Sequence, residues 1–570
     1  MVAAPQVEAA YEGRAVLEAG GNAADATVTA ALVQGIVDPH RSGIGGFGCS
    51  TVYFRRARDG QGPVALSIDF HGRVGRRARP DQWEKIYVGP AEDGFGYLVE
   101  GKVNDVGYGS ITTPGMLAGL GEIHRRFGRL PWRDLVERAI PYAENGFFVP
   151  REIAEFWRRP GLCGRVSTRD RLGFTEAGRA ICFKKDASGA LIRDSEGRLE
   201  PFATGERFVQ RELAATYARI AEEGWESFYR GALAREIAQD FAAQGAWVTA
   251  EDLAEFRPSV GPPLAGSYRG HRILTTPLPG GGVALLQALR LLEEHDLASL
   301  GHLSVDAIDL IADVLRVVSA DRLERQGDPA FGALPDERFL EADLLAELRR
   351  RIKADAPIDP EGPDTTHLSL IDGEGNLVAF SHSLGYNSGV FAPGLGVLFN
   401  NCMSGFHPLP GHIGSIAPGK ARSTAIAETI VFRRDGTPWM TIGSPGGARI
   451  TGALVQALLG CIDFDMTLAE SVVQPRFDGY EPRLLALDQR FPEPILRELE
   501  SRGWTLKPSD KPYGAIGRIY GIEIEESPRR RLIAGIDPGS PGAAFRSRPG
   551  SSRAPSDAIL PHGPERASSE

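Results

Sequence analysis

The chain has 570 residues, of which 42% are hydrophobic and 24% charged, and its formal net charge is −10. This length suffices for a large core divided over two or more domains, and the composition is that of an ordinary globular protein. The acidic balance argues against a nucleic-acid or anionic-membrane partner, because such partners favour a basic face.

Three features bear on the compartment. No run approaches the roughly 20 apolar residues that span a bilayer, and the first residues lack the basic and apolar regions of a signal peptide. The five cysteines are scattered and show no CxxC spacing, which argues against a disulfide framework and against a zinc site. We therefore predict a cytoplasmic protein, or an exported one if the true N-terminus lies upstream.

Helices predominate in the first part of the chain. Asn22 is placed to cap a helix in the run NAADATVTAALVQGIVDP, whose small and apolar residues indicate burial on most sides. A glycine-rich stretch then leads into the strand CSTVYF, which continues after a turn into PVALSIDFHGR. Between about residues 110 and 260, apolar residues recur at helical spacing, as in LAGLGEIHRRFG and WRDLVERAIPYAENG. The strand-like GSYRGHRILTTP precedes two further helices, VALLQALRLLEEHD and a long one in SVDAIDLIADVLRVVSADRLERQGDP that is closed by Gly327-Asp328-Pro329.

From residue 365 onward the pattern changes to strands. We predict them over THLSLID, NLVAFSHSL, GVLFNN, ETIVFRRDGTPWMTIGS and RIYGIEIEE, with one helix, ARITGALVQALLGCIDF, between them. Residues 546–570 are rich in Pro, Ser, Gly and Arg, which predicts a disordered tail. The whole pattern predicts an α+β fold.

Several familiar motifs do not fit. The stretch GIGGFG at residues 43–48 matches GxGxxG, but a dinucleotide site needs a strand before this loop and a helix after it. Here the order is reversed, so a packing turn is the better interpretation. The sequence contains no HExxH or EF-hand pattern and no GxSxG or SxxK pair. We therefore predict no cofactor and no metal.

The stretch Ser444-Pro445-Gly446-Gly447 lies between a predicted strand and a predicted helix. Such a turn presents free backbone N–H groups at the positive end of the helix dipole. In isolation an ordinary helix N-terminus is the favoured interpretation. The alternative is an oxyanion hole formed by the amides of Gly446 and Gly447, since residues without a Cβ let a substrate approach the backbone.

Thr365 begins a predicted strand directly behind Asp364. A threonine hydroxyl in mid-chain is a poor nucleophile because nothing nearby takes its proton. A cut before Thr365 would free an α-amine with a pKa of roughly 7.7–8.0, which is a built-in general base. On strand propensity alone Thr365 is one more β-branched residue. The choice between the two depends on the rest of the chain.

Along nearly its whole length the chain resembles the gamma-glutamyltranspeptidase family of N-terminal-nucleophile hydrolases. The resemblance rests on the order and spacing of VLEAGGNAADATVTAALV, VTAEDLAEFRPSV, GGGVALLQALRLLE, SADRLERQGDPAF, DTTHLSLIDGEGNLVAFSHSL, APGKARSTAIAETIVF and GSPGGARI. It implies a four-layer αββα sandwich made as a proenzyme that cleaves itself between Asp364 and Thr365. Residues 1–364 would form a large subunit and residues 365–545 a small one, and the two would stay associated.

The resemblance also implies catalytic roles. Thr365 would be nucleophile and base, and Ser383 the supporting hydroxyl, where the family usually has a threonine. Gly446 and Gly447 match the family's oxyanion amides. The expected substrate is a gamma-glutamyl-type amide, and the acyl group would pass to water or to an amine acceptor.

The acyl-binding positions depart from the family's pattern. At the positions where the family binds the α-amino group of the substrate, this chain has Gly385, Cys402 and Gly405. A charge-assisted hydrogen bond is worth roughly 1.5–3 kcal/mol, so an α-aminoacyl group should bind less well. We expect a carboxylate to be held by His71, which stands at the family's Arg position, and by Arg73 and Thr424. We also expect Asn387 to replace part of the lost amide contact.

Three functions therefore stay open. The first is a gamma-glutamyltranspeptidase-like hydrolase and acyltransferase acting on glutathione or its analogues. The second is an acylase for glutaryl or cephalosporin-type side chains that does not read an α-amine. The third is an inactive family member with a binding or structural role, against which the joint presence of Thr365, Ser383 and the Gly446-Gly447 pair argues.

Overall fold

The computed structural model describes residues 1–56, 60, 62–91, 96–161, 163–352, 365–481, 483–514, 516–526 and 530–547. Asp364, the residue before the predicted cut, lies outside the described residues, and so does the predicted tail from residue 548 onward.

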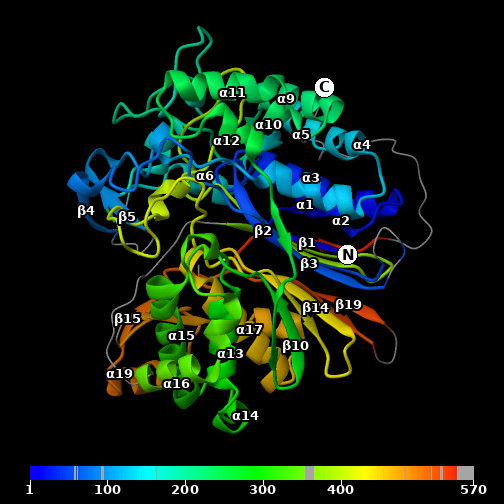
Figure 1. Cartoon of the computed structure of the whole chain (residues 1–570), viewed down its shortest axis with the longest axis vertical. Helices are drawn as coiled ribbons and strands as arrows, with labels where there is room; N and C mark the ends of the chain where they lie inside the picture. Colours follow the sequence, from blue (N-terminus) through cyan, green and yellow to red (C-terminus); the bar gives the residue numbers. More distant parts are fainter. Residues whose placement is uncertain are drawn as a thin grey trace, which may run out of the picture.

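Two antiparallel sheets lie face to face at the centre of the molecule, with helices on both outer sides (Figure 1). The first sheet has the order β20-β1-β11-β12-β2-β3-β8. Its strands are β1 (Val2–Ala4), β2 (Phe47–Phe54), β3 (Val64–Phe70), β8 (Ser259–Gly261), β11 (Thr366–Ile371), β12 (Leu377–Ser383) and β20 (Ala543–Phe545). The second has the order β19-β18-β14-β13-β10-β9. Its strands are β9 (Leu264–Tyr268), β10 (His271–Thr275), β13 (Thr429–Phe432), β14 (Pro438–Gly443), β18 (Tyr520–Glu525) and β19 (Arg531–Ile536).

Helices α1 (Val7–Glu18), α2 (Ala23–Val37) and α3 (Met116–Phe127) cover the first sheet, and α13 (Gly282–Leu292), α15 (Val305–Arg325) and α17 (Ile450–Asp463) cover the second (Figure 1). The α2 helix is buried along its whole length, and the Asn22 side chain caps it by accepting from the amides of Ala24 and Asp25. The layers therefore follow the αββα order that the family resemblance implies.

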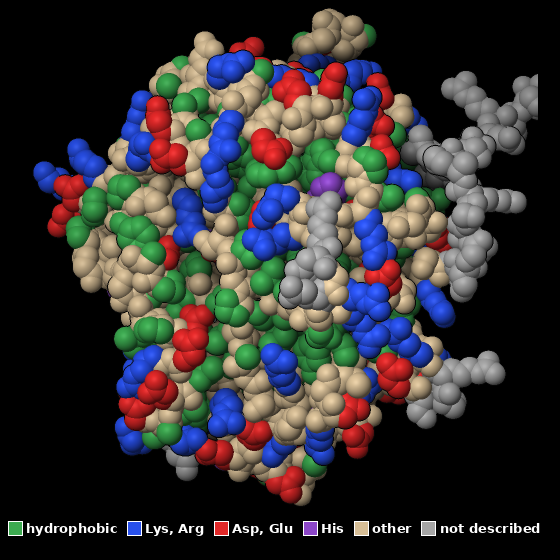
Figure 2. Space-filling model, turned by 45° about the vertical axis from the view of Figure 1, so that its right-hand side comes forward, with side chains coloured by type: hydrophobic (Ala, Val, Ile, Leu, Met, Phe, Trp, Pro, Cys, Tyr) green, Lys and Arg blue, Asp and Glu red, His purple; other side chains and the backbone are tan. Residues whose placement is uncertain are grey.

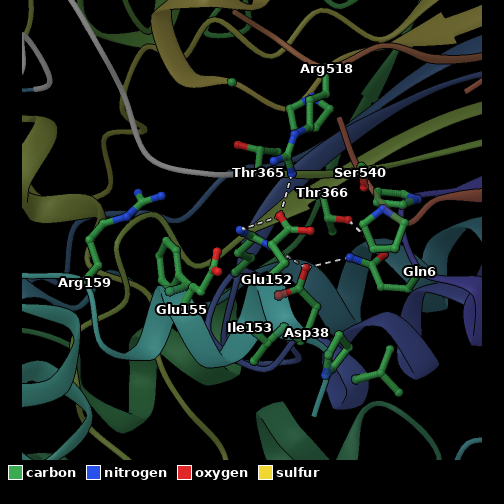
Figure 3. A pocket seen from close by; sticks show the side chains of 18 of the residues that line it. Gln6, Asp38, Glu152, Ile153, Glu155, Arg159, Thr365, Thr366, Arg518 and Ser540 are labelled. Atoms are coloured by element: carbon green, nitrogen blue, oxygen red, sulfur yellow. Dashed lines mark hydrogen bonds and ion pairs between the residues drawn. The ribbon is translucent and has the colours of Figure 1, made fainter. Parts of the chain in front are cut away.

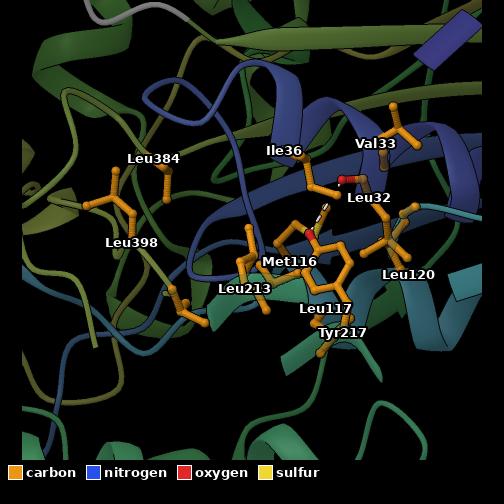
Figure 4. Packing of buried hydrophobic residues seen from close by; sticks show 14 of the residues in the cluster. Leu32, Val33, Ile36, Met116, Leu117, Leu120, Leu213, Tyr217, Leu384 and Leu398 are labelled. Atoms are coloured by element: carbon orange, nitrogen blue, oxygen red, sulfur yellow. Dashed lines mark hydrogen bonds between the residues drawn. The ribbon is translucent and has the colours of Figure 1, made fainter. Parts of the chain in front are cut away.

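A further group of helices lies over α2 and α3. It includes α4 (Trp132–Glu137), α5 (Ile140–Glu144), α9 (Arg211–Glu223), α10 (Ser227–Arg230), α11 (Ala232–Ala243) and α12 (Ala250–Glu255). Leu32 of α2, Leu117 of α3 and Tyr217 of α9 meet in the core between these layers (Figure 4). The Tyr217 hydroxyl donates to the Leu32 carbonyl at 3.4 Å, so this buried ring has a polar partner.

The remaining elements are peripheral. They are β4 (Tyr87–Pro90), β5 (Tyr97–Val99), β6 (Phe147–Phe148), α6 (Arg151–Trp157), α7 (Thr168–Leu172), α8 (Glu176–Cys182), β7 (Arg207–Phe208), α14 (Leu297–Leu300), α16 (Ala342–Arg351), α18 (Leu468–Val472), β15 (Phe477–Glu481), β16 (Leu484–Leu487), α19 (Glu493–Ser501) and β17 (Thr505–Pro508).

Two predicted elements differ from the structure. The helix predicted over residues 132–146 is divided into α4 and α5, and Pro141 lies in the first turn of α5. The strand predicted over GVLFNN is wrong, because Leu398 and Phe399 form only isolated bridges. The Asn400 side chain donates to the carbonyls of Gly45 and Thr112 at 3.0 Å. This segment is thus bound between loops and does not lie along a strand.

Each central sheet contains strands from both sides of Thr365. In the first sheet, β11 lies between β1 and β12, and β12 lies between β11 and β2. In the second, β13 pairs with β10. The chain before residue 365 and the chain after it therefore build one shared core.

On the face drawn in Figure 2, basic and acidic side chains are interspersed, and hydrophobic side chains lie across its middle. Among the residues that the structure describes, no helix has the length and apolar character needed to cross a membrane.

Candidate active site

Thr365 precedes the central strand β11 and is only 6% exposed. It lines two cavities, a small one of about 80 Å³ and a large one of about 760 Å³. The residue proposed as the nucleophile therefore lies where two spaces of very different size meet.

The β11–β12 hairpin brings Ser383 beside Thr365. Asp372 accepts hydrogen bonds from the amides of Glu374 and Asn376 at 2.9 and 3.0 Å, which closes the turn. Thr366 pairs with His382 across the hairpin, so the antiparallel register places Thr365 opposite Ser383. Both Thr365 and Ser383 line the small cavity.

The Ser383 hydroxyl accepts a hydrogen bond from the Gly385 amide at 2.9 Å. The backbone of Ser383 also packs against the glycine loop, residues 43–48. A Cβ on Gly46 would lie 2.5 Å from the Ser383 carbonyl oxygen. This loop has α2 before it and β2 after it, as the sequence predicts for a packing turn. Its glycines let two backbones approach at the edge of the small cavity.

Gly446 and Gly447 lie between the end of β14 at Gly443 and the start of α17 at Ile450. Their φ angles are 148° and 57°, in the region that glycine adopts without steric cost. In the described part of the chain neither amide donates to another backbone group. Gly446 lines the large cavity and Gly447 the small one, so an oxyanion formed at Thr365 would have two candidate donors.

His71 and Thr424 form a buried pair at the small cavity. His71 Nε2 lies 2.8 Å from Thr424 Oγ1, and its Nδ1 lies 2.5 Å from Asp69 Oδ1. Burial acts to raise the pKa of Asp69, but His71 and then Arg73 outweigh it, and the pKa is lowered overall. Thr424 lines the cavity, whereas His71 lies behind it and holds the Thr424 hydroxyl.

The structure places Arg73 and Asn387 differently from the expectation. Neither is among the described residues that line the small or the large cavity. Arg73 donates to Asp328 at 3.1 Å and to Asp69 at 3.0 Å. The Asn387 amide group donates to the His40 carbonyl at 3.2 Å. The structure thus brings Thr365, Ser383, Gly447 and Thr424 together around the small cavity and leaves these two side chains in supporting contacts.

Sequence reasoning missed two arginines. Arg322 and Arg422 both line the small cavity, and the Arg422 side chain is 7% exposed. The signal was a basic residue two positions before Thr424, in the segment APGKARSTA. Alone, this residue has no feature that sets it apart from a surface arginine.

The large cavity is lined by charged and by apolar side chains (Figure 3). Glu152 accepts from Arg518 at 2.7 Å and from Arg41 at 3.1 Å. Gln6 donates to Asp38 at 2.6 Å on the same side as Thr366. Charges of both signs therefore surround the space on this side of Thr365.

A metal site is not seen in the part of the chain that the structure describes, where no group of three His, Cys, Asp or Glu residues could hold an ion. Four of the cysteines, Cys49, Cys182, Cys402 and Cys461, are buried.

The sequence and the structure are similar to those of known proteins. A family model described as Gamma-glutamyltranspeptidase matches residues 9–547. The chain is 32% identical to the Acylase ACY 1 proenzyme of Pseudomonas sp. (strain SE83), over 90% of this chain and 88% of that protein. It is 29% identical to the Glutathione hydrolase proenzyme of Escherichia coli (strain K12), over 95% of this chain and 90% of that protein.

Among solved structures, a cephalosporin acylase from Bacillus halodurans superposes with a TM-score of 0.81 at 26% identity, covering 96% of each chain. These similarities confirm the predicted N-terminal-nucleophile fold.

Proposed function

We propose, because this chain belongs to the gamma-glutamyltranspeptidase family, that it cuts itself before Thr365 and then uses Thr365 as its nucleophile. The chain is an enzyme of the amidohydrolase and acyltransferase class to which its relatives belong. The observation that supports Thr365 most is its place directly before β11, at both cavities and opposite Ser383. Domain bounds at 1–364 and 365–545 follow from this cut.

The proposed reaction begins with attack of the Thr365 hydroxyl oxygen on the carbonyl carbon of an amide. The α-amine of Thr365 takes the hydroxyl proton, and the amides of Gly446 and Gly447 donate to the oxyanion. The C–N bond breaks, the leaving amine receives the proton, and an ester joins the acyl group to Thr365. Water or a second amine then attacks this ester and releases Thr365.

The two cavities suggest which part of the substrate lies where. The small cavity contains Ser383 and Thr424 and suits a short acyl chain, and the large cavity suits the amine part or an acceptor. Each of the two sheets contains strands from before the cut and strands from after it, which supports subunits that stay associated after cleavage.

For the acyl group we propose two candidates. A gamma-glutamyl-type amide is suggested by relatives named glutathione hydrolase proenzyme. A glutaryl or cephalosporin-type side chain is suggested by relatives named acylase proenzyme and cephalosporin acylase. Gly405 favours the second candidate. It lines the small cavity, but as a glycine it has no side chain that could bind an ammonium group.

The test is the state of the purified protein. On a denaturing gel we expect two fragments, and N-terminal sequencing of the smaller one should begin Thr-Thr-His. Thr365→Ala should stay uncut and inactive, whereas Thr365→Ser, which keeps a hydroxyl, should still be cut. A single uncut chain, or a cut at another bond, would exclude the proposed mechanism.

A further inference from the structure

Glu152 lies in the first turn of α6 and accepts hydrogen bonds from two arginines at one carboxylate oxygen. Arg518 Nη1 lies 2.7 Å and Arg41 Nη2 lies 3.1 Å from Glu152 Oε1. Figure 3 shows the side chains of Glu152 and Arg518 pointing toward one another. All three residues line the large cavity, as Thr365 does. Because Arg518 follows Thr365 in the chain and the other two precede it, the carboxylate joins segments on both sides of the proposed cut.

Arg41 belongs to the backbone that holds the segment after Ser383. The Leu384 amide donates to the Arg41 carbonyl at 2.8 Å. The Arg41 guanidinium carbon also lies 5.0 Å from the ring centre of Phe156, one turn after Glu152 on α6. Leu384 directly follows Ser383 in the chain, so a shift of Arg41 would also shift the backbone of Ser383.

Arg518 belongs to the backbone that holds the turn at residues 444–447, here called the oxyanion turn. The Arg518 amide donates to the Pro445 carbonyl at 3.1 Å. The preceding residue, Gly517, packs so closely that a Cβ on Gly446 would lie 2.9 Å from the Gly517 Cα. A shift of Arg518 would therefore also shift the oxyanion turn.

We propose that Glu152 is a positioning residue of the catalytic centre. Through Arg41 it holds the backbone after Ser383, and through Arg518 it holds the oxyanion turn. The two halves of the site are thereby kept in one arrangement around Thr365. A displacement of about 1 Å in such an arrangement can cost roughly a hundredfold in rate. This inference rests on the proposed function, because it assumes attack by Thr365 and an oxyanion at this turn.

Glu152→Ala removes the acceptor that the two arginines share. We expect kcat for hydrolysis of gamma-glutamyl- or glutaryl-p-nitroanilide to fall by about tenfold, with KM within about twofold of the parent. Loss of a charged hydrogen bond costs roughly ten- to a hundredfold, and the lower end applies because the Glu152 side chain is 26% exposed. The effect falls on kcat because a group that orients the catalytic residues acts in the transition state.

Glu152→Gln and an exposed glutamate provide the comparison. Glu152→Gln keeps an oxygen that both arginines can reach, so kcat should stay within about threefold of the parent. Glu137→Ala is the matched control, because the Glu137 carboxylate pairs with Arg133 on an exposed face of α4. This control should change neither kcat nor KM.

A double-mutant cycle tests whether the two arginines act through Glu152. Arg41→Met and Arg518→Met each remove one side of the bridge, and each should lower kcat. Combination of either with Glu152→Ala should lower kcat little further, because the bridge is already broken. Fully multiplicative effects would overturn the proposal.

The reference for every rate is the concentration of Thr-Thr-His N-termini, so that slow processing does not imitate slow catalysis. If the parent hydrolyses neither compound, the rate of self-cleavage takes the place of kcat, because it uses the same hydroxyl. A parent without a Thr365 N-terminus would overturn the proposed function and this inference with it.

Three outcomes in a processed parent would overturn only the role of Glu152. Unchanged kcat in Glu152→Ala would show that the bridge is not needed. A rise in KM alone would show that Glu152 binds the substrate. A Glu152→Gln enzyme as slow as Glu152→Ala would show that the negative charge acts and not the bridge.

Discussion

His367 on β11 lies 2.9 Å from Glu428, Nδ1 to Oε2, and both side chains are almost completely buried. The pair connects β11 of the first sheet, two residues after Thr365, to the residue that precedes β13 of the second sheet. The His367 ring also lies against Gly443 at the end of β14, where a Cβ would be 2.8 Å from His367 Nε2. One side chain thus fixes β11, the strand that follows Thr365, relative to the segment that leads into Gly446 and Gly447.

Replacement of His367 by alanine should be strongly destabilising. It would leave Glu428 buried without its partner, and loss of one member of a buried pair costs roughly 3–5 kcal/mol of the free energy of unfolding. Chemical denaturation of the purified variant measures this. Arg133→Ala is the control, because it removes an exposed pair with Glu137 on a helix surface and should change stability little. Equal effects of the two substitutions would show that the buried pair has no special role.

The glycine loop gives a second prediction. In Gly46→Ala the new Cβ would lie 2.5 Å from the Ser383 carbonyl oxygen and 2.9 Å from that of Gly43, both backbone atoms. Overpacking of this kind costs roughly 1–3 kcal/mol, and displacement of Ser383 should also lower kcat. Gly261→Ala is the matched control, since nothing lies within 4 Å of a Cβ there. Thermal unfolding and kcat, measured on both variants, should separate them. Full activity of Gly46→Ala would contradict the predicted approach of the loop to Ser383.

The local structure around the candidate site can be predicted from short stretches of sequence, whereas the roles of its residues are what the family resemblance implies. The alternating pattern on either side of the turn at Asp372 predicts the hairpin, and the antiparallel register then places Ser383 opposite Thr365. The order of strand, turn and helix around Gly446 and Gly447 is likewise visible in the sequence. The hairpin and the turn before the helix each lie within a stretch of fewer than about twenty-five residues. Each can therefore be recognised from a short segment of the sequence.

The acyl-binding side depends on long-range contacts, and there the sequence is a weaker guide. Arg73 is only two residues from His71 in the sequence. Its guanidinium nevertheless donates to Asp328, which is 255 positions away in the chain. Arg422 lines the cavity only because Gly405 leaves room for it. Neither relationship follows from spacing or propensity, since each depends on which loops the folded chain brings together.

His382 should make stability depend on pH. Burial, and secondarily His367, lowers its pKa to about 3, and its Nε2 lies 2.9 Å from Gln34 Oε1. The folded state keeps the ring neutral while the unfolded chain binds a proton below about pH 6.5. Stability should therefore fall as the pH drops from about 6.5, by up to about 1.4 kcal/mol per pH unit from this group.

Chemical denaturation at a series of pH values tests this slope. His382→Gln should make the slope between pH 6.5 and 4.5 shallower, because the variant has no ring to protonate. His295→Gln, which replaces an exposed histidine, is the matched control. If both variants keep the slope of the parent, His382 is not the group that is held neutral.

Ser383 should support the nucleophile without binding the acyl group. Its oxygen accepts the Gly385 amide hydrogen at 2.9 Å, so its own proton is available to an acceptor in the small cavity that it shares with Thr365. Removal of a hydrogen bond to a developing charge costs roughly ten- to a hundredfold in rate. We therefore expect Ser383→Ala to lower kcat by that factor with little change in KM, measured on a glutaryl or gamma-glutamyl p-nitroanilide. Ser383→Thr keeps the hydroxyl and should stay within about tenfold of the parent. A Ser383→Ala enzyme with unchanged kcat, or one in which KM alone rises, would show that Ser383 does not act on Thr365.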